Sequence, residues 1–351
     1  MQKKIIALAV AALASTAAFA QTNVTIYGIA DASVSATTNL GATTGQTGFK
    51  VNSGTLSTSR IGFKGVEDLG NGLKAVFVLE YGLGLDTSNG IGYSTTSSAI
   101  ARQQYVGLTG GFGTAVAGHL QTTGLDFTVA GTALGGSLPL GATNVASTVT
   151  YGLITGNNLI SALGGGRQDN AVAYISPSLG GVVVAYNHAR VTETALTSNT
   201  TDAHGDLISV GYDNGPINAG VIYTKVTNPT TLANDNLKEW GLRAGYDFKV
   251  VKLQATYQQA KSDDSATYVG KDKKWVVSAT VPIGSKVAVI GEYASLNVDS
   301  TAANDDIKAG TLAATYALSK RTTAYAGFVA KRSQVLNADT NTYALGLRHA
   351  F

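Results

Sequence analysis

The feature that most constrains this chain is an alternation of apolar and polar residues with a period of two, which recurs along most of its length. In one run, Val251, Leu253, Ala255 and Tyr257 alternate with polar residues. Successive side chains of a β-strand point to opposite faces, so each run predicts a strand with one apolar face. Sixteen such runs start near Val24, Ser57, Leu73, Ser98, Gly113, Asp169, Gly181, His204, Pro216, Leu237, Val250, Lys273, Ser285, Asp306, Arg321 and Asn341. Helical periodicity is almost absent, and the chain is therefore predicted to be all-β.

The connections between these runs alternate between short and long. Short ones contain residues that favour tight turns, such as Asp-Asn-Gly-Pro at 213–216 and Pro-Ile-Gly at 282–284. Longer polar connections lie between them, for example at 37–55 and 261–272. Tight turns at one end and long loops at the other are typical of outer-membrane barrels, in which the short turns are periplasmic. An even number of strands places both chain ends on the periplasmic side.

Alternation alone does not distinguish a membrane barrel from a soluble sandwich, and further features favour the barrel. The runs reach the ~9–11 residues that a tilted strand needs to cross the hydrocarbon layer. Their apolar faces often end in an aromatic residue, which resembles the girdles at membrane interfaces. These aromatic residues are Phe63, Tyr81, Tyr223, Trp240, Tyr246, Tyr257 and Trp275. The chain has no Cys, so disulfides are excluded, and a closed hydrogen-bonded ring in lipid can supply the stability instead.

Residues 1–20 form a predicted secretory signal. Two lysines precede an apolar stretch that is too short for a membrane anchor, and Ala-Phe-Ala at 18–20 predicts cleavage before Gln21. The mature chain, residues 21–351, is predicted to be a single barrel domain. Without the two lysines, the 25 basic residues become 23 against 22 acidic residues, and a net charge of +1 gives no support for binding nucleic acid.

One connection, from Gln121 to Gln168, departs from the pattern because it is about fifty residues long. A structureless loop of that length argues against the strand assignment unless the loop has a function. It is rich in Gly, Ala, Thr and Leu, and Asp126 and Arg167 are its only charged residues. So few charges are unusual for a loop in water. The composition indicates a loop that folds back into the barrel and packs against its wall.

Three segments carry a resemblance to a known family: 24–31 (VTIYGIAD), 57–75 (STSRIGFKGVEDLGNGLKA) and 345–351 (LGLRHAF). In these, the chain resembles the general porins of Gram-negative outer membranes, of the β-proteobacterial type. The resemblance covers essentially the whole mature chain. It implies a sixteen-stranded antiparallel barrel, a homotrimer with one pore in each subunit, and an inward-folded third loop that narrows the channel. Here that constriction loop corresponds to about 121–168.

The resemblance also implies roles for particular residues. Basic wall residues stand at the constriction of similar porins, and the matching positions are Arg60, Arg102 and Arg167. Phe351 matches the terminal aromatic residue that the barrel-assembly machinery recognises. The acidic and glycine motif that many porins carry in the inward loop is missing, and many relatives have a basic residue in place of His119. The pore of this chain is therefore expected to be lined less strongly.

Alternation adds further candidates for the pore lining. Arg60 and Lys64 lie opposite the apolar face of their strand, and Lys74 does so in the next strand. Asp126 is the only acidic residue of the inward loop. Rings of charge at a narrowing set the selectivity of a pore, and this wall carries more basic than acidic residues. We therefore expect a weak preference for anions.

The expected function is passive diffusion of ions and small hydrophilic solutes across the outer membrane. The expected partners are two further copies of the chain, outer-membrane lipid and lipopolysaccharide, and the assembly machinery. No cofactor and no metal are expected, because the four histidines lie far apart in the sequence. A substrate-specific channel remains an alternative, although the inward loop has only two aromatic residues, Phe127 and Tyr151. A barrel enzyme is the other alternative, although no G-x-S-x-G motif is present.

Overall fold

The computed structural model describes residues 23–39, 47–88, 91, 101–137, 139–146, 149–151, 154–156, 166–190, 204–230, 233–262, 271–297, 306–334 and 339–351. The predicted signal segment at 1–20 and parts of the predicted loop at 121–168 lie outside the described residues.

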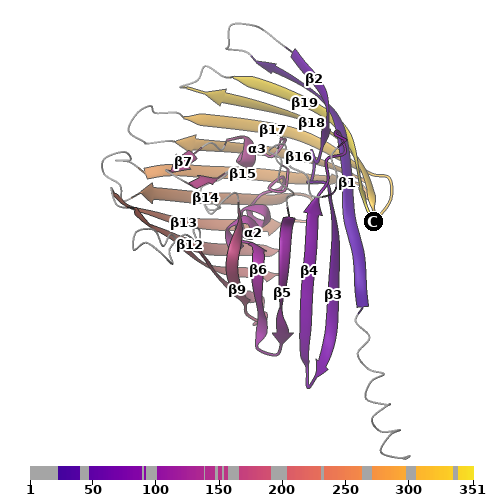
Figure 1. The fold of residues 1–351 in the computed structure, drawn as a ribbon. Helices are drawn as coiled ribbons and strands as arrows, with labels where there is room; N and C mark the ends of the chain where they lie inside the picture. Colours follow the sequence, from indigo (N-terminus) through magenta and orange to yellow (C-terminus); the bar gives the residue numbers. More distant parts are fainter. Residues whose placement is uncertain are drawn as a thin grey trace, which may run out of the picture.

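The described strands form one closed antiparallel ring (Figure 1). β1 (Asn23–Asn39) closes the ring by pairing with β19 (Thr340–Ala350), so that the first and last strands share a seam. The other strands of the ring are β2 (Thr47–Ser53), β3 (Arg60–Gly70), β4 (Leu73–Gly82), β5 (Ala101–Gly110), β6 (Gly113–Gln121), β9 (Arg167–Ile175), β10 (Val182–Arg190), β11 (His204–Asn214), β12 (Ile217–Thr230), β13 (Ala233–Asp247), β14 (Lys252–Ser262), β15 (Lys271–Ile283), β16 (Val287–Asn297), β17 (Ile307–Ala317) and β18 (Thr322–Ser333).

The described part of the chain confirms the predicted number of wall positions. β2 and β3 pair with different parts of β1, β2 with residues 32–38 and β3 with residues 23–29. They occupy the same position in the ring, so the 17-stranded sheet of described residues has sixteen wall positions. Each predicted run corresponds to a strand that starts within four residues of the expected point. β2 itself was predicted as loop, because it offers only Phe49 and Val51 as a period-two pattern.

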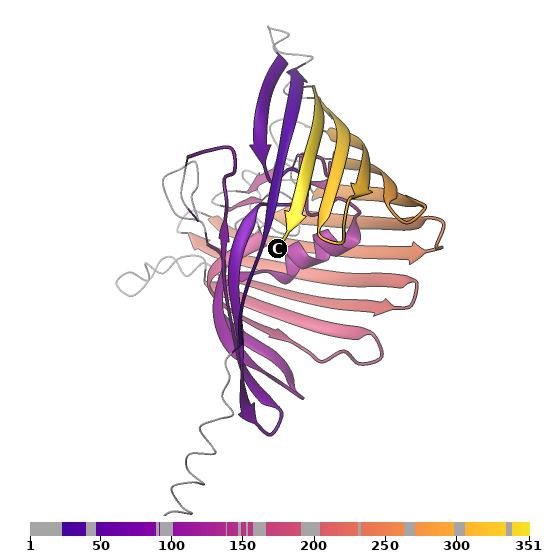
Figure 2. The ribbon, with the colours of Figure 1, turned by 90° about the vertical axis from the view of Figure 1, so that its right-hand side faces the viewer.

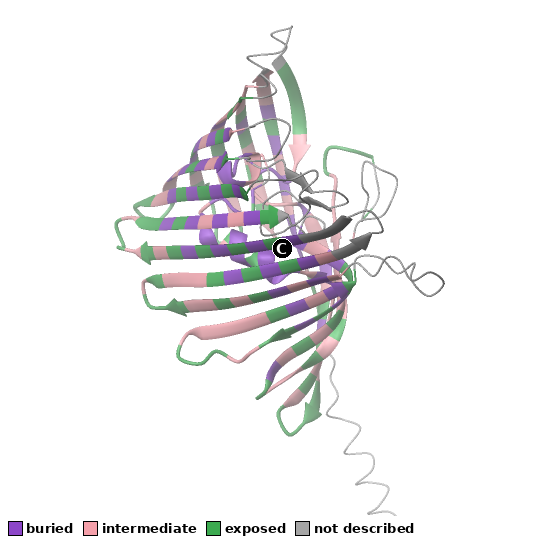
Figure 3. Cartoon of the chain, turned by 90° about the vertical axis from the view of Figure 1, so that its left-hand side faces the viewer, coloured by how far each residue is buried: buried purple, intermediate pink, exposed green. Residues whose placement is uncertain are grey.

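Buried and exposed residues alternate along the strands (Figure 3). In contrast to a soluble protein, the exposed face is apolar and the buried face is polar. Large apolar side chains such as Val221, Leu242 and Leu312 are exposed on the outer face, at 47%, 47% and 60%. The inner face instead buries charged side chains, each no more than 5% exposed: Asp31, Glu80, Glu239, Lys274 and Glu292. An apolar exterior around a polar interior is the pattern of a wall that faces lipid outside and water inside.

Two short helices of the described chain lie inside the ring (Figures 1 and 2). α2 (Thr123–Gly131) contacts β10 to β14, and α3 (Ala142–Val145) contacts β16 and β17. The hydroxyl of Thr122 accepts a hydrogen bond from Leu125 N at 3.4 Å and caps α2. The sequence did not predict these helices, since both are too short to show a helical period. Within the described residues, no helix is long and apolar enough to cross a bilayer.

A short hairpin follows the helices. It is formed by β7 (Val149–Tyr151) and β8 (Ile154–Gly156), which pair with each other and not with the ring. The connection predicted as one loop at 121–168 therefore contains secondary structure of its own, which accounts for its length.

The two ends of the barrel sequence meet at the seam between β1 and β19. Gly28 N donates to the carbonyl of Phe351 at 3.2 Å, and Phe351 N donates to the carbonyl of Gly28 at 3.1 Å. A Cβ on Gly28 would lie 2.3 Å from the Phe351 ring and 2.6 Å from the carbonyl oxygen of Arg60. The ring could turn away, but the backbone carbonyl is fixed by the sheet. Only glycine fits at this position.

Replacement of Gly28 by Ala is expected to lower the free energy of unfolding by about 1–3 kcal/mol, because the added methyl group overpacks the seam. Gly291→Ala is the matched control, since a Cβ on Gly291 meets nothing within 4 Å. Thermal unfolding in detergent, followed by circular dichroism, measures both variants. Equal melting temperatures for the two would contradict the tight packing at Gly28.

Candidate functional site

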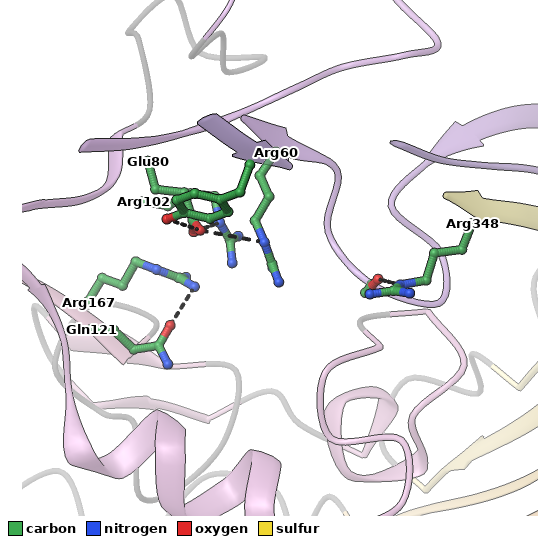
Figure 4. A network of polar contacts seen from close by, with 8 residues as sticks. Arg60, Glu80, Arg102, Gln121, Arg167 and Arg348 are labelled. Carbon is green, nitrogen blue, oxygen red and sulfur yellow. Dashed lines mark hydrogen bonds and ion pairs between the residues drawn. The ribbon is translucent and has the colours of Figure 1, made fainter. Parts of the chain in front are cut away.

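One carboxylate organises two arginines on the inner wall. Glu80 of β4 lies between Arg60 of β3 and Arg102 of β5 (Figure 4). Its Oε1 accepts a hydrogen bond from Nε of Arg102 at 2.8 Å, and its Oε2 lies 3.5 Å from Nε of Arg60. The hydroxyl of Tyr27 donates to the same Oε2 at 3.0 Å. Glu80 is only 5% exposed, and the two guanidinium groups compensate its buried charge.

A third arginine faces this group from the base of the inward segment. Arg167 begins β9 and pairs in register with Gln121, which ends β6. Nη2 of Arg167 donates to Oε1 of Gln121 at 3.1 Å. Figure 4 shows the Arg167 side chain extending toward the space that Arg60 and Arg102 also face, and its charge is repelled by both of theirs. Three guanidinium groups thus share one part of the lumen.

Asp126 is the acidic residue nearest to Arg167 on the inward segment. It lies in the first turn of α2, and its Oδ1 accepts a hydrogen bond from Nε2 of Gln121. Its side chain is open to the lumen, yet the surrounding wall removes part of its hydration, which raises the pKa of the carboxyl group; the hydrogen bond from Gln121 and the charge of Arg167 act in the opposite direction. Asp126 and Glu80 together offset two of the three guanidinium charges, so the group is net positive.

The opposite wall fixes the inward segment through buried charged side chains. Glu292 of β16 accepts hydrogen bonds from Leu134 N at 3.1 Å and from Thr143 N at 3.0 Å. Lys274 of β15 is 0% exposed, and its Nζ donates to the carbonyl of Thr143. The charges of Glu292 and Glu239 both attract that of Lys274. Side chains of the wall thereby replace the water that the backbone between α2 and α3 would otherwise bind.

Further polar contacts hold the segment along its described course. The carbonyl of Ala130 accepts from Gln254 of β14 at 2.9 Å, and Ala133 N donates to Ser278 of β15 at 3.1 Å. On the other side, Ser137 donates to the carbonyl of Thr55, between β2 and β3, at 2.6 Å. The described part of the segment therefore contacts wall positions on both sides of the ring.

Of the remaining predicted site residues, Lys64 lies beside the arginine group and Lys74 lies away from it. Lys64 is exposed four residues along β3 from Arg60, with its Nζ 5.3 Å from the centre of the Tyr27 ring. Lys74 pairs with Asp68 next to the turn between β3 and β4, about 26 Å along the strand from Gly82, the residue opposite Arg60. The structure thus brings Arg60, Arg102, Arg167 and Asp126 together and leaves Lys74 at the far end of the barrel.

The sequence reasoning missed Lys274 as an anchor of the inward segment. Lys273 and Lys274 are adjacent on β15, so one of them faces outward and the other inward. Trp275 is exposed on the outer face, and the alternation of side chains therefore places Lys274 in the lumen. It also missed Tyr27 and Gln121, whose polar groups position Glu80 and Arg167. Neither residue carries a charge, so no sequence signal distinguished them from other polar wall residues.

The histidines lie outside this arrangement. His119 contacts Asp169 at 2.7 Å and His188 contacts Asp206 at 2.9 Å, both on the outer face of the barrel. In the part of the chain that the structure describes, no three His, Cys, Asp or Glu side chains are grouped so as to hold a metal ion.

Comparison with known proteins agrees with this architecture. The family model described as Gram-negative porin matches residues 7–350. This chain belongs to the Gram-negative porin family. The porin is 32% identical to outer membrane porin protein 32 of Delftia acidovorans, over 98% of this chain and 92% of that protein. It is 29% identical to an outer membrane porin protein of Bordetella pertussis, with 100% of each chain covered.

Solved structures support the same conclusion. The porin superposes on the anion-selective porin from Comamonas acidovorans with a TM-score of 0.76 at 25% identity, covering 94% of this chain and 100% of that one. It superposes on OmpF of Salmonella typhi with a TM-score of 0.70 at 15% identity, covering 94% of this chain and 98% of that one, which shows the shared fold alone. The porin is thus an outer-membrane channel, and its family and fold are those of a pore rather than of an enzyme.

Replacement of Lys274 by Met should loosen the inward segment, because it leaves Glu292 and Glu239 buried without their cation, a change that typically costs about 3–5 kcal/mol. We expect a larger or unsteady single-channel conductance in planar bilayers. Lys273→Met is the control, since Lys273 lies on the same strand but is exposed on the outer face. Unchanged conductance in the properly folded Lys274 variant would show that this residue does not hold the segment.

Proposed function

We propose that this porin is a general diffusion channel for ions and small hydrophilic solutes with a weak preference for anions. The narrowest part of the pore lies between the arginines of β3, β5 and β9 and the inward segment at about 121–168. The observation that carries the proposal is the group of Arg60, Arg102 and Arg167, whose three positive charges face only two carboxylates. Low-dielectric walls focus the field of such a group into the pore, which raises the local concentration of anions.

A relative supports the sign of the preference. The porin from Comamonas acidovorans, whose structure resembles this chain at 25% identity, is described as anion-selective. Asp126 limits the effect in this chain, because its carboxylate lies beside Arg167 and attracts cations. Lys64 lines the wall next to this group, and Lys74 lines the lumen near the short turns, where the field of the narrow part has decayed in salt.

We expect the preference to depend on the arginines and on ionic strength. Replacement of Arg60 and Arg167 by Gln should shift the reversal potential in a KCl gradient toward that of a cation-selective pore. In this variant the two carboxylates of Glu80 and Asp126 face only one arginine, so the group becomes net negative. Arg321→Gln, in an exposed turn, is the control for charge alone. The difference between wild type and variant should shrink as salt rises, since the Debye length falls from about 30 Å at 0.01 M to about 3 Å at 1 M.

The reversal potential of the unmodified porin tests the proposal most directly. A clear preference for cations would refute anion selectivity. Saturable block of the conductance by one solute at low concentration would instead identify a substrate-specific channel.

Export and assembly complete the proposal. A signal at residues 1–20 is removed before Gln21, the mature barrel at 21–351 forms a homotrimer, and Phe351 is the residue that the barrel-assembly machinery recognises. OmpT of Vibrio cholerae, which has the same fold at 15% identity, has been solved in a trimer form. Lipopolysaccharide and outer-membrane lipid surround the trimer.

Mass spectrometry of the protein isolated from outer membranes is expected to give a mature chain that begins at Gln21. Sedimentation in detergent of matched density is expected to give the mass of three chains. A mature chain that still carries residues 1–20, or a monomeric mass in mild detergent, would contradict the corresponding part of the proposal.

A further inference from the structure

A fourth arginine faces the lumen near the three arginines of the site. Arg348 of β19 is partly buried and lies between Leu347 and His349, which are exposed on the outer face. The alternation of side chains along a strand therefore points Arg348 inward. Figure 4 shows its side chain extending from β19 toward the part of the lumen that holds Arg60. The positive charge of Arg348 repels that of Arg60, as the charge of Arg102 does.

The register of the sheet places Arg348 close to Arg60. Arg60 pairs with Ile29 of β1, and Arg348 pairs with Asp31, two residues farther along the same strand. With β1 between them, the two arginines start about 10 Å apart around the ring and about 7 Å apart along it. An ion between their side chains is within about one Debye length, ~8 Å at physiological salt, of both charges.

The four arginines occupy every second strand over one arc of the ring. The strands of this arc pair in the order β9, β6, β5, β4, β3, β1 and β19. Arg167, Arg102, Arg60 and Arg348 belong to the first, third, fifth and last of these strands. The main wall contacts of α2 and α3 are with β10 to β14 and with β16 and β17. The arginines therefore form a positive arc on the side of the lumen away from these contacts.

Asp31 is the only acidic residue on β1, β2, β18 and β19, and neutral groups bind its carboxylate. Its Oδ2 accepts hydrogen bonds from Leu56 N at 2.8 Å and from Ser57 N at 2.7 Å, and its Oδ1 accepts one from the hydroxyl of Tyr325 at 2.5 Å. Asp31 is 0% exposed, whereas Arg348 is partly exposed. The carboxylate offsets part of the arginine charge from within the wall, and the positive end of the pair is the one that meets the lumen.

A neutral hydroxyl group holds the guanidinium group of Arg348. Its Nε donates to Oγ of Ser57, in the connection between β2 and β3, at 2.6 Å. Two residues earlier in this connection, the carbonyl of Thr55 accepts a hydrogen bond from Ser137 of the inward segment at 2.6 Å. Arg348 is therefore fixed beside a point at which the wall meets the inward segment. Like Arg167, it is oriented by a neutral partner, which does not compensate its charge.

We propose that Arg348 is a fourth anion-contacting residue of the pore, which extends the positive arc from β9 to the seam at β19 and strengthens the preference for small anions. The inference rests on the proposed anion preference and names a residue that contributes to it. A second guanidinium group beside Arg60 lengthens the part of the wall over which an anion is attracted. If Arg348 only braced the connection between β2 and β3 through Ser57, its charge would have no effect on ion selectivity.

The reversal potential of the full-length porin in planar bilayers, in a KCl gradient near about 0.1 M, tests the proposal. Arg348→Gln removes the charge and keeps an N–H donor for Ser57. Arg321→Gln is the matched control, because it removes the same charge from an exposed turn whose carbonyl accepts a hydrogen bond from Ala350 N at 2.8 Å. We expect the permeability ratio of chloride to potassium to fall about twofold in the test variant and to change by less than about 20% in the control. Near 1 M salt, where the Debye length is about 3 Å, the variant should approach the wild type.

Chemical restoration of the charge separates an electrostatic role from a bracing role. The chain has no Cys, so the Arg348→Cys variant carries a single thiol. Its reaction with a cationic methanethiosulfonate, the trimethylammonium-ethyl reagent, should return the permeability ratio toward that of the wild type. The anionic sulfonatoethyl reagent should lower the ratio further. If the cysteine variant does not fold, Arg348→Lys provides the comparison, because it keeps the charge without the planar guanidinium group and should keep the wild-type ratio.

The possible results are distinguishable. An unchanged permeability ratio in Arg348→Gln, when Arg60→Gln lowers it, would overturn the inference, as would equal shifts in Arg348→Gln and Arg321→Gln. The same holds if neither thiol reagent alters the ratio of the Arg348→Cys variant. A cation preference of the wild type would refute the proposed anion preference, but a further shift toward cations in Arg348→Gln alone would still support Arg348 as a residue that contacts ions in the pore.

Discussion

The hydrogen bonds of the backbone are the constraint on which this structure depends. Hydrocarbon offers no partner to an amide or a carbonyl, so strands that cross it must pair on both sides. The seam between β1 and β19 completes that pairing and leaves the described ring without an edge. In the closed ring, each side chain of a strand points either outward to the lipid or inward to the lumen. Val221 and Leu242 lie on the lipid side, while Glu80 and Glu292 lie on the inner side, where water and polar groups can compensate their charge.

Charge on the inner wall has two different uses. Lys274 and Glu292 are buried and form hydrogen bonds with the backbone of the inward segment. Their charges are compensated locally and contribute little to the potential in the lumen. The charges of the three arginines are only partly compensated. Glu80 alone binds both Arg60 and Arg102, and the partner of Arg167 is the neutral Gln121, so positive potential remains in the lumen. The same residue types thus serve as structural anchors on one wall and as a source of electrostatic potential on the other.

The architecture could be predicted from the sequence because every strand of a barrel wall shows the same alternation of apolar and polar residues. Period-two runs located all sixteen wall positions, and the length and composition of 121–168 indicated a loop inside the barrel. Details that depend on contacts between distant segments could not be predicted. The helix at Thr123–Gly131 is stabilised by packing of Phe127 against Ile222 and by a Thr122 cap, not by a periodic pattern. The burial of Lys274 depends on its contact with the carbonyl of Thr143, far along the chain, which no local pattern reveals.

The seam at Gly28 has a consequence for biosynthesis. The amide and carbonyl of this residue, in the first strand of the ring, bond to the backbone of Phe351, which directly follows the last strand, β19. A ribosome that has not yet reached β19 cannot supply the closing strand, so a shorter nascent chain cannot pair its first strand on both sides. The ring can therefore close only once β19 is available, and until then the open strand edges need protection from aggregation.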